Sequence, residues 1–174
     1  MVKKYVLTGG PGIGKSTVLE RLDKRIYKIS EVASWVIKTE LARNSELLPW
    51  IDRNKFQKEV LEIQLQWERE IPKEVEIAFL DRGIIDGIAY YQIDGLRIPQ
   101  EFIQAAKSSD YEKIFLLEPI KIYENTKVRK EDIETAKRIH KEIGNTYKSF
   151  GYDPIIIPAE NPRARISRIL EYIN

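Results

Sequence analysis

The sequence contains no cysteine, only one histidine and no long run of apolar residues. The absence of cysteine excludes disulfides, thiolate nucleophiles and cysteine-bound zinc, and a single histidine excludes a multi-histidine metal site. Any metal must therefore be held by oxygen ligands. Because no segment is apolar over the length of a signal peptide or a membrane span, we expect a cytoplasmic protein that binds no membrane.

The chain also has almost no excess of one sign of charge, since 29 basic and 27 acidic side chains leave a net charge of +2. This balance provides no field that would attract nucleic acid, so we expect a small-molecule partner and leave the oligomeric state open. Charged residues make up 32% of the chain and methionine occurs once, a bias that resembles hyperthermophile proteins. The length is typical of one domain spanning residues 1–174.

Short β-branched or aromatic segments alternate with segments whose apolar residues lie three or four positions apart. The short segments predict five strands, at 4–8, 25–29, 75–80, 113–117 and 155–157. The others predict helices, including one with Phe56, Val60 and Ile63 on its apolar face and one over 131–150 that ends at Gly151. The alternation predicts a three-layer α/β/α fold with a parallel five-stranded sheet, which binds ligands at the carboxyl ends of its strands.

A phosphate-binding loop follows the first predicted strand. The letters GGPGIGKS at 9–16 satisfy the pattern G-x-x-x-x-G-K-[ST] between a strand and a helix. Its backbone N–H groups point toward the phosphates, Lys15 reaches the outer phosphates and Ser16 ligates Mg²⁺. We therefore predict that ATP or GTP binds here with Mg²⁺. The predicted nucleotide-binding residues are Gly9, Gly10, Pro11, Gly12, Ile13, Gly14, Lys15, Ser16 and Thr17.

Acidic residues follow two other predicted strands. Phosphoryl transfer to an alcohol needs a carboxylate near the metal and another that orients or deprotonates the alcohol. Asp81 is a candidate for the metal, the acceptor and catalysis, and Glu31 for the acceptor and catalysis. The alternative for Asp81 is a helix N-cap, and for Glu31 a first-turn acid beside Ser30 as N-cap. Sequence alone does not decide which acid handles the proton. Arg82 and Asp86 are further acceptor-site candidates.

A basic segment follows the fourth predicted strand. We predict a lid at 119–132 carrying Arg129, and a following helix carrying Arg138. A lid arginine neutralises the transferring phosphoryl group and excludes water. Arg129 is therefore a catalytic candidate and Arg138 a substrate-binding candidate, with a solvated surface as the alternative. His140 is predicted to lie on the surface without a role, and Trp50 is a possible base or acceptor contact.

The C-terminal segment predicts a capping helix. Arg163, Arg165 and Arg168 alternate with an apolar face that includes Ile166 and Ile169. No aromatic residues are interleaved with these arginines, so we interpret them as a polar helix face and not as a nucleic-acid patch.

Three of these features together resemble a known family. The phosphate loop, the run DRGIIDGIAY at 81–90 and RKED at 129–132 before a long helix are similar to the small AAA-labelled P-loop family that includes the nicotinamide-riboside kinase domain of NadR-type proteins. The resemblance extends over about 2–169, and the wider relatives are nucleoside and nucleotide kinases. It implies a nucleotide-kinase-like fold, ATP as donor, Mg²⁺, and a small hydroxyl or phosphate acceptor near Glu31, Asp81 and Arg82.

Two functions are compatible with these features. The first is an ATP-dependent phosphotransferase that moves the γ-phosphoryl group to a nucleoside, a nucleotide or a nicotinamide-riboside-like acceptor. The alternative is a regulatory ATPase or GTPase switch that acts through a protein partner. The sequence favours the kinase because no N/T-K-x-D guanine-reading motif follows a later strand.

Overall fold

The computed structural model describes residues 2–119 and 133–173. None of the helices in this part of the chain is long and apolar enough to cross a membrane. The predicted lid at 119–132 lies, apart from Pro119, outside the described residues. The elements, in chain order, are β1 (Lys3–Thr8), α1 (Lys15–Arg21), β2 (Tyr27–Ile29), α2 (Val32–Ala42), α3 (Arg53–Arg69), β3 (Ile77–Asp81), α4 (Ile84–Ile93), α5 (Gln100–Ser108), β4 (Tyr111–Leu117), α6 (Ile133–Ser149), β5 (Ile155–Ile157) and α7 (Pro162–Glu171).

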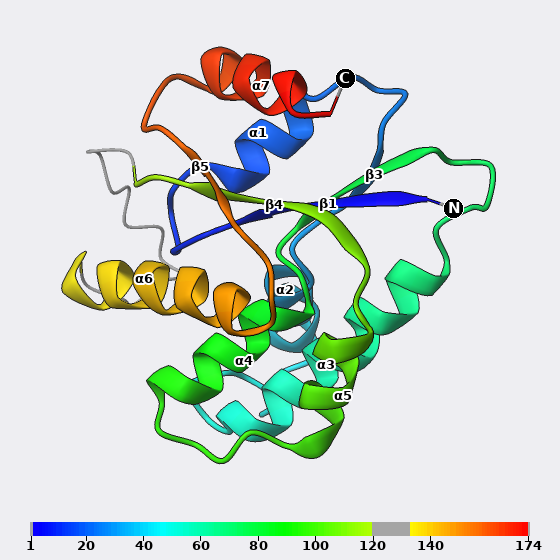
Figure 1. The fold of residues 1–174 in the computed structure, drawn as a ribbon. Coiled ribbons are helices and arrows are strands. Elements are labelled where there is room, and N and C mark those ends of the chain that lie inside the picture. Colours follow the sequence, from blue (N-terminus) through cyan, green and yellow to red (C-terminus); the bar gives the residue numbers. More distant parts are fainter. Residues whose placement is uncertain (1, 120–132, 174) are drawn as a thin grey trace.

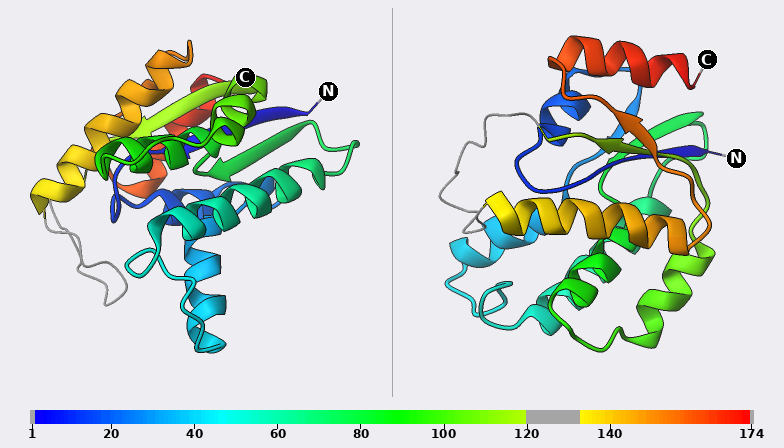
Figure 2. Two further views of the ribbon diagram at one scale, coloured as in Figure 1. Left: turned by 90° about the horizontal axis from the view of Figure 1, so that it is seen from below. Right: turned by 60° about the vertical axis from the view of Figure 1, so that its left-hand side comes forward.

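The five predicted strands form one parallel sheet with the order β2-β3-β1-β4-β5. Helices α1 and α7 cover one face of this sheet, and α4 and α6 cover the other with α3 and α5 beyond them (Figure 1; Figure 2, right). Successive side chains of β1 pack on opposite faces of the sheet. Tyr5 and Leu7 belong to the apolar core beneath α1 and α7, whereas Val6 belongs to the core beneath α4 and α6. The predicted three-layer α/β/α fold is therefore confirmed.

The register of the central strands places the two key strand ends together. Leu7, the residue before the end of β1, pairs with Asp81, the last residue of β3. On the other side of β3, Ile29 of β2 pairs with Leu80, so the chain leaves β2 toward Glu31 at the same edge. The carboxyl ends of three neighbouring strands thus bring the phosphate loop, Asp81 and Glu31 to one edge of the sheet.

Helix α3 forms as predicted, but its buried face differs from the predicted one. Phe56 is buried, whereas Val60 and Ile63 are only partly buried. The other buried positions of α3 are Gln57, Leu61 and Gln64. Apolar periodicity alone missed the two glutamines because it assigns polar side chains to solvent. For α6 the predicted C-terminal end is confirmed, since Gly151 has a φ of 87° just beyond the helix.

Candidate active site

The phosphate loop runs from the end of β1 to the start of α1. Gly9 has a φ of +126°, which residues with a side chain rarely adopt, and a Cβ atom there would lie 3.0 Å from the backbone oxygen of Leu117, so this position favours glycine. Gly14 is the N-cap of α1 and provides no side-chain acceptor for the first-turn N–H groups. A helix start of this kind offers its N–H groups and its positive dipole end to an anion.

Lys15 lies inside the loop and only 3% of its surface is exposed. Its Nζ atom donates to Gly10 O at 2.8 Å and lies 3.5 Å from Gly9 O. A lysine ammonium is a compact charge on a flexible stem and can exchange such carbonyls for phosphate oxygens. The geometry therefore places the positive charge of Lys15 at the backbone that would surround the phosphates.

Asp81 and Ser16 form the part of the site that fits a magnesium ion. Ser16 Oγ donates to Asp81 Oδ2 at 2.6 Å. The other oxygen, Oδ1, is buried without a hydrogen-bond partner among the described residues. Mg²⁺ prefers oxygen ligands and is usually bound through one or two carboxylates together with substrate phosphates. The described part of the chain contains no group of three or more acidic or histidine side chains arranged to hold a metal ion, so such an ion would take further ligands from phosphate oxygens or water.

The environment of Asp81 opposes its negative charge. Burial and the neighbouring carboxylate of Glu31 raise the pKa of Asp81, whereas Lys15, the hydroxyl of Ser16 and Arg82 act in the opposite direction. The net shift is upward. A divalent cation beside this carboxylate would supply the positive charge that the protein itself provides incompletely.

Arg82 joins the second half of the site to the phosphate loop. Its Nε atom donates to Glu31 Oε1 at 2.6 Å, and its Nη1 atom donates to Gly9 O at 2.9 Å. The residue adopts a φ of 72°, an uncommon conformation for a residue with a side chain, which indicates that the surrounding contacts determine it. Although burial lowers the pKa of Arg82, Tyr90, Glu31 and Asp86 raise it well above the ordinary value, so the guanidinium remains charged.

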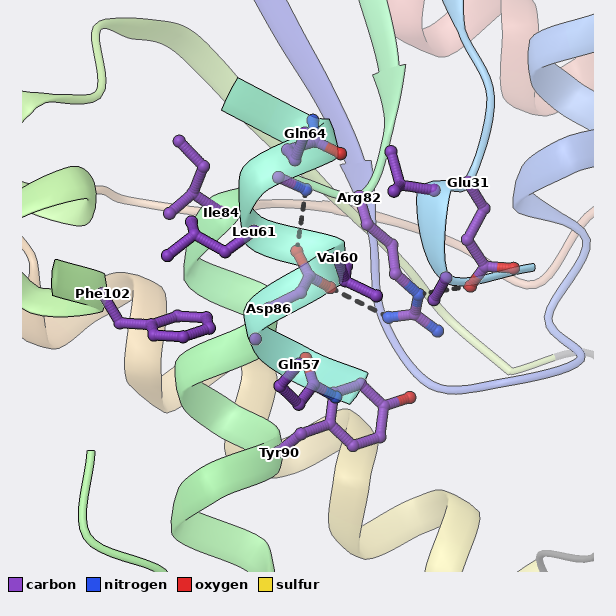
Figure 3. A pocket seen from close by; sticks show the side chains of 14 residues that line it. Glu31, Gln57, Val60, Leu61, Gln64, Arg82, Ile84, Asp86, Tyr90 and Phe102 are labelled. Carbon is purple, nitrogen blue, oxygen red and sulfur yellow. Dashed lines mark hydrogen bonds and ion pairs between the residues drawn. The ribbon is translucent and has the colours of Figure 1, made fainter. Parts of the chain in front are cut away.

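The alternative roles considered for the two acids are not observed. Asp81 ends β3, and the N-cap of α4 is Gly83. Glu31 is itself the N-cap residue of α2, but its side chain caps no N–H group. Instead, the Glu31 carboxylate accepts a hydrogen bond from Arg82 (Figure 3). It accepts another from Ser34 Oγ. Both acids are therefore directed into the site by tertiary contacts and not by helix capping.

Asp86 forms a hydrogen-bonded network at the centre of the site. Its carboxylate accepts hydrogen bonds from Thr8 Oγ1 at 2.6 Å, Tyr147 OH at 2.7 Å, Arg82 Nη1 at 2.9 Å and Gly83 N at 3.0 Å. A buried carboxylate with four donors is fully engaged by the protein. Asp86 thus links β1, α4 and α6 and positions Arg82, and it keeps little capacity to bind an acceptor directly.

A pocket lies between α2, α3, α4 and α5. Its charged lining consists of Glu31, Arg82 and Asp86 (Figure 3). The remaining lining side chains are mainly apolar or aromatic, and two are amides: Val32, Ala33, Gln57, Val60, Leu61, Gln64, Ile84, Tyr90 and Phe102. An apolar pocket with a few convergent polar groups is the usual form of a small-molecule site.

Gln57 is a pocket residue that the sequence analysis missed. Its side chain is 4% exposed and makes no hydrogen bond to the described residues. Gln64 also lines the pocket, but its amide nitrogen donates to Glu68 Oε1 at 2.9 Å. The seven-residue spacing of the two glutamines, which puts them on one helix face, is the signal that could have revealed them.

Two other candidates, Arg138 and Trp50, do not line the pocket. Arg138 is exposed on α6, and Trp50 is 50% exposed in the loop before α3. The catalytic candidate Arg129 lies outside the described residues. The roles assigned to Arg129 and Arg138 therefore stay predictions.

His140 and Arg165 both contact the phosphate loop, contrary to the sequence-based expectation. The His140 side chain is 13% exposed, and its Nδ1 atom accepts from Gly10 N at 3.2 Å. Arg165 is 1% exposed. Its guanidinium donates to three backbone carbonyls, Ile13 O at 2.7 Å, Glu118 O at 2.5 Å and Pro158 O at 3.1 Å. Helix α7 is thus a capping helix as predicted, but one arginine on its expected polar face is a buried clamp.

Comparison with solved structures shows the fold of nucleoside and nucleotide kinases. NadR protein in complex with NR shares 18% identity with a TM-score of 0.74, over 99% of this chain and 50% of that one. Thymidylate kinase from Ehrlichia chaffeensis shares 13% identity with a TM-score of 0.68, over 98% of this chain and 97% of that one. Deoxyadenosine kinase from M. mycoides with bound dATP shares 13% identity with a TM-score of 0.64, over 99% of both chains.

The chain spans about half the length of the NadR structures that it matches. No curated protein matches its sequence. A family model described as AAA domain matches residues 4–165, which is most of the chain. The matched region includes the phosphate loop, both acids and the Arg165 clamp. The chain therefore belongs to this AAA-domain family of P-loop proteins, on a fold shared with nucleoside and nucleotide kinases.

Proposed function

We propose that the protein is an ATP-dependent phosphotransferase that moves the γ-phosphoryl group to a hydroxyl of a small acceptor bound in the pocket. The observation that carries this proposal is the position of Arg82. Its guanidinium lines the pocket and also donates to Gly9 O of the phosphate loop at 2.9 Å. One side chain thus connects the place where an acceptor fits with the place where phosphates fit, as a direct transfer between two bound molecules requires.

The two acids take different roles in this proposal. Asp81 faces Ser16 and belongs to the metal side, whereas Glu31 lines the pocket and belongs to the acceptor side. Glu31 orients the acceptor hydroxyl and accepts its proton, and Arg82 holds the Glu31 carboxylate in place. Lys15 binds the transferring phosphoryl group, and bound Mg²⁺ would neutralise charge on the phosphate oxygens. Arg129 of the predicted lid would add positive charge near the transferring phosphoryl group.

The charges of the pocket favour an acceptor without a phosphate. Among the described lining residues one cation, Arg82, faces two carboxylates, Glu31 and Asp86, and donates to both. A phosphate beside Arg82 would therefore meet more negative than positive charge, which disfavours its binding. A nucleoside-like compound fits better, with its ring between the aromatic and apolar walls and its polar edge on the amide of Gln57, which has no hydrogen-bond partner among the described residues.

Two solved structures of the same fold agree with this proposal. One is NadR protein in complex with NR, and the other is deoxyadenosine kinase with bound dATP. Their identity to this chain is 18% and 13%, so they support the fold and leave the acceptor to experiment.

The test is a transfer assay with Mg²⁺ and either ATP or GTP, alone and with nucleosides, nucleoside monophosphates and nicotinamide riboside. We expect phosphorylation that depends on a phosphate-free acceptor, together with preference for ATP. Transfer to nucleoside monophosphates alone would support kinase activity but refute the proposal that the acceptor carries no phosphate. Tight nucleotide binding with only slow, acceptor-independent hydrolysis would favour the regulatory switch.

A further inference from the structure

His140 on α6 holds a peptide of the phosphate loop, a task that the proposed reaction does not use. Gly10 N–H donates to His140 Nδ1 at 3.2 Å. This N–H belongs to the peptide whose carbonyl is Gly9 O, and that oxygen accepts from Arg82 Nη1 at 2.9 Å. Because the C=O and N–H of a trans peptide point in opposite directions, His140 and Arg82 hold the same peptide from its two sides.

This peptide needs such support because glycine flanks it on both sides. Glycine populates many backbone conformations, so no side chain on either residue restricts rotation of the Gly9–Gly10 peptide. Helix α6 lies directly against the peptide. A Cβ atom on Gly10 would lie 3.0 Å from Ala136 O and 3.2 Å from His140 Cβ. The backbone of α6 and the Cβ of His140 therefore leave no room for a side chain at Gly10.

The contact requires a neutral imidazole. Nδ1 accepts a hydrogen bond only without a proton of its own, so the proton lies on Nε2, which is 3.7 Å from Glu118 Oε1. The groups that face the ring are Glu118 beyond β4 and Lys15 of α1. Burial and Lys15 lower the pKa of His140 while Glu118 raises it, and the net shift is downward. The accepting form therefore predominates at neutral pH.

We propose that His140 is a positioning residue for the acceptor pocket, because it fixes the Gly9–Gly10 peptide so that Gly9 O stays on Arg82. The inference rests on the proposed function only for its effect on turnover. Arg82 in turn holds Glu31, so the chain of contacts runs from α6 through the loop to the acceptor side. Loss of the imidazole acceptor should raise the acceptor KM about three- to tenfold, the effect of one hydrogen bond, with a smaller change in kcat.

Two variants separate positioning from packing. In His140→Asn, the amide oxygen replaces Nδ1 as an acceptor that does not titrate, whereas His140→Leu fills similar volume without an acceptor. Protonation of His140 at acid pH should raise the acceptor KM of the wild type. We expect the Asn variant to keep an acceptor KM near that of the wild type at neutral pH and to lose this rise at acid pH. The Leu variant should show the raised KM at every pH. Lys141→Leu, an exposed position on α6, is the matched control. Equal losses in the Asn and Leu variants would reduce His140 to a packing residue and overturn the proposal.

The Gly10 amide provides a readout that is independent of turnover. In ¹H–¹⁵N NMR spectra of the nucleotide-free protein, we expect its shift to follow the titration of His140 in the wild type and not in His140→Asn. Its hydrogen exchange should accelerate in His140→Leu. A Gly10 amide that responds to neither change would overturn the positioning role even if the protein is a kinase. The expected NMR result without any acceptor phosphorylation would refute the proposed function alone.

Discussion

Ser16 Oγ donates a hydrogen bond to Asp81 Oδ2 at 2.6 Å, across 65 positions of the sequence. The contact exists because Leu7, the residue before the end of β1, pairs with Asp81 of β3, while Ser16 lies in the first turn of the following helix. It leaves the second Asp81 oxygen buried and without a partner in the described part of the chain. We therefore expect single substitutions of Ser16 or Asp81 to affect the metal-dependent part of the reaction.

Asp81→Asn should retain nucleotide binding without Mg²⁺ and lose metal-dependent transfer. The amide still accepts from Ser16, but it removes the negative charge that favours a divalent cation. We expect turnover to fall by about a hundredfold or more, in the range seen for loss of an electrostatic catalytic group. Steady-state kinetics against Mg²⁺ concentration measures the effect. Transfer equal to that of the wild type would remove Asp81 from the metal site.

The same substitution should stabilise the nucleotide-free protein at neutral pH. Burial, followed by Glu31, raises the pKa of Asp81 above its ordinary value of 3.8, so folding favours the protonated form. The resulting contribution to stability is fully present below the unfolded pKa and is lost as pH rises through the folded pKa. Asp81→Asn should therefore have the higher Tm at pH 7, and the difference should vanish toward pH 3.8. A lower Tm at every pH would show that the charge of Asp81 stabilises the fold.

Glu31→Gln should reduce kcat with a smaller effect on the acceptor KM. The amide oxygen still accepts from Arg82, but the side chain no longer accepts the hydroxyl proton. Loss of a general base typically lowers the rate by about 10²- to 10⁴-fold. Glu40→Gln is the matched control, because Glu40 lies in α2, the helix that begins directly after Glu31, and pairs with Arg43 outside the pocket. Unchanged kcat in Glu31→Gln would assign proton transfer to another group.

Gln57→Leu should raise the acceptor KM while leaving the KM for ATP unchanged. The variant preserves the size of the side chain and removes the amide that faces the pocket without a partner among the described residues. A hydrogen bond to an acceptor is worth about 0.5–1.5 kcal/mol, so we expect an increase of about two- to tenfold. Gln66→Leu, at an exposed position on the same helix, should have no effect. Equal KM values for the two variants would exclude Gln57 from acceptor binding.

Arg165→Met should destabilise the protein and weaken ATP binding together. The variant keeps an apolar stem but leaves three backbone carbonyls without their donor, one of which belongs to Ile13 in the phosphate loop. Unsatisfied buried groups cost about 1–3 kcal/mol each, and partial access to water reduces the sum, so we expect a loss of about 2–4 kcal/mol. Urea unfolding measures it. The control Arg163→Met, exposed on the same helix, should stay within about 0.5 kcal/mol, and equal stability of both variants would contradict the clamp.

The local sequence determined the phosphate loop, the five strands and their parallel arrangement. Short segments of sequence carry these signals: a glycine pattern between a strand and a helix, and apolar residues that repeat every two positions in strands and every 3.6 in helices. For the same reason the placement of Asp81 at the sheet edge beside the loop was predictable, since parallel strands end together.

Only the tertiary structure decided which distant side chains meet at that edge. Arg82 binds Glu31 across 51 positions, His140 meets Gly10 across 130, and Arg165 reaches Ile13 across 152. Each pair depends on the strand order β2-β3-β1-β4-β5 and on helices that cross the sheet, which a local pattern does not encode. Apolar periodicity assigns polar residues to solvent and therefore gives no signal that Arg165, His140 or Gln57 is enclosed. In the folded protein Arg165 lies against backbone carbonyls, His140 against the Gly10 N–H group, and Gln57 in the pocket wall.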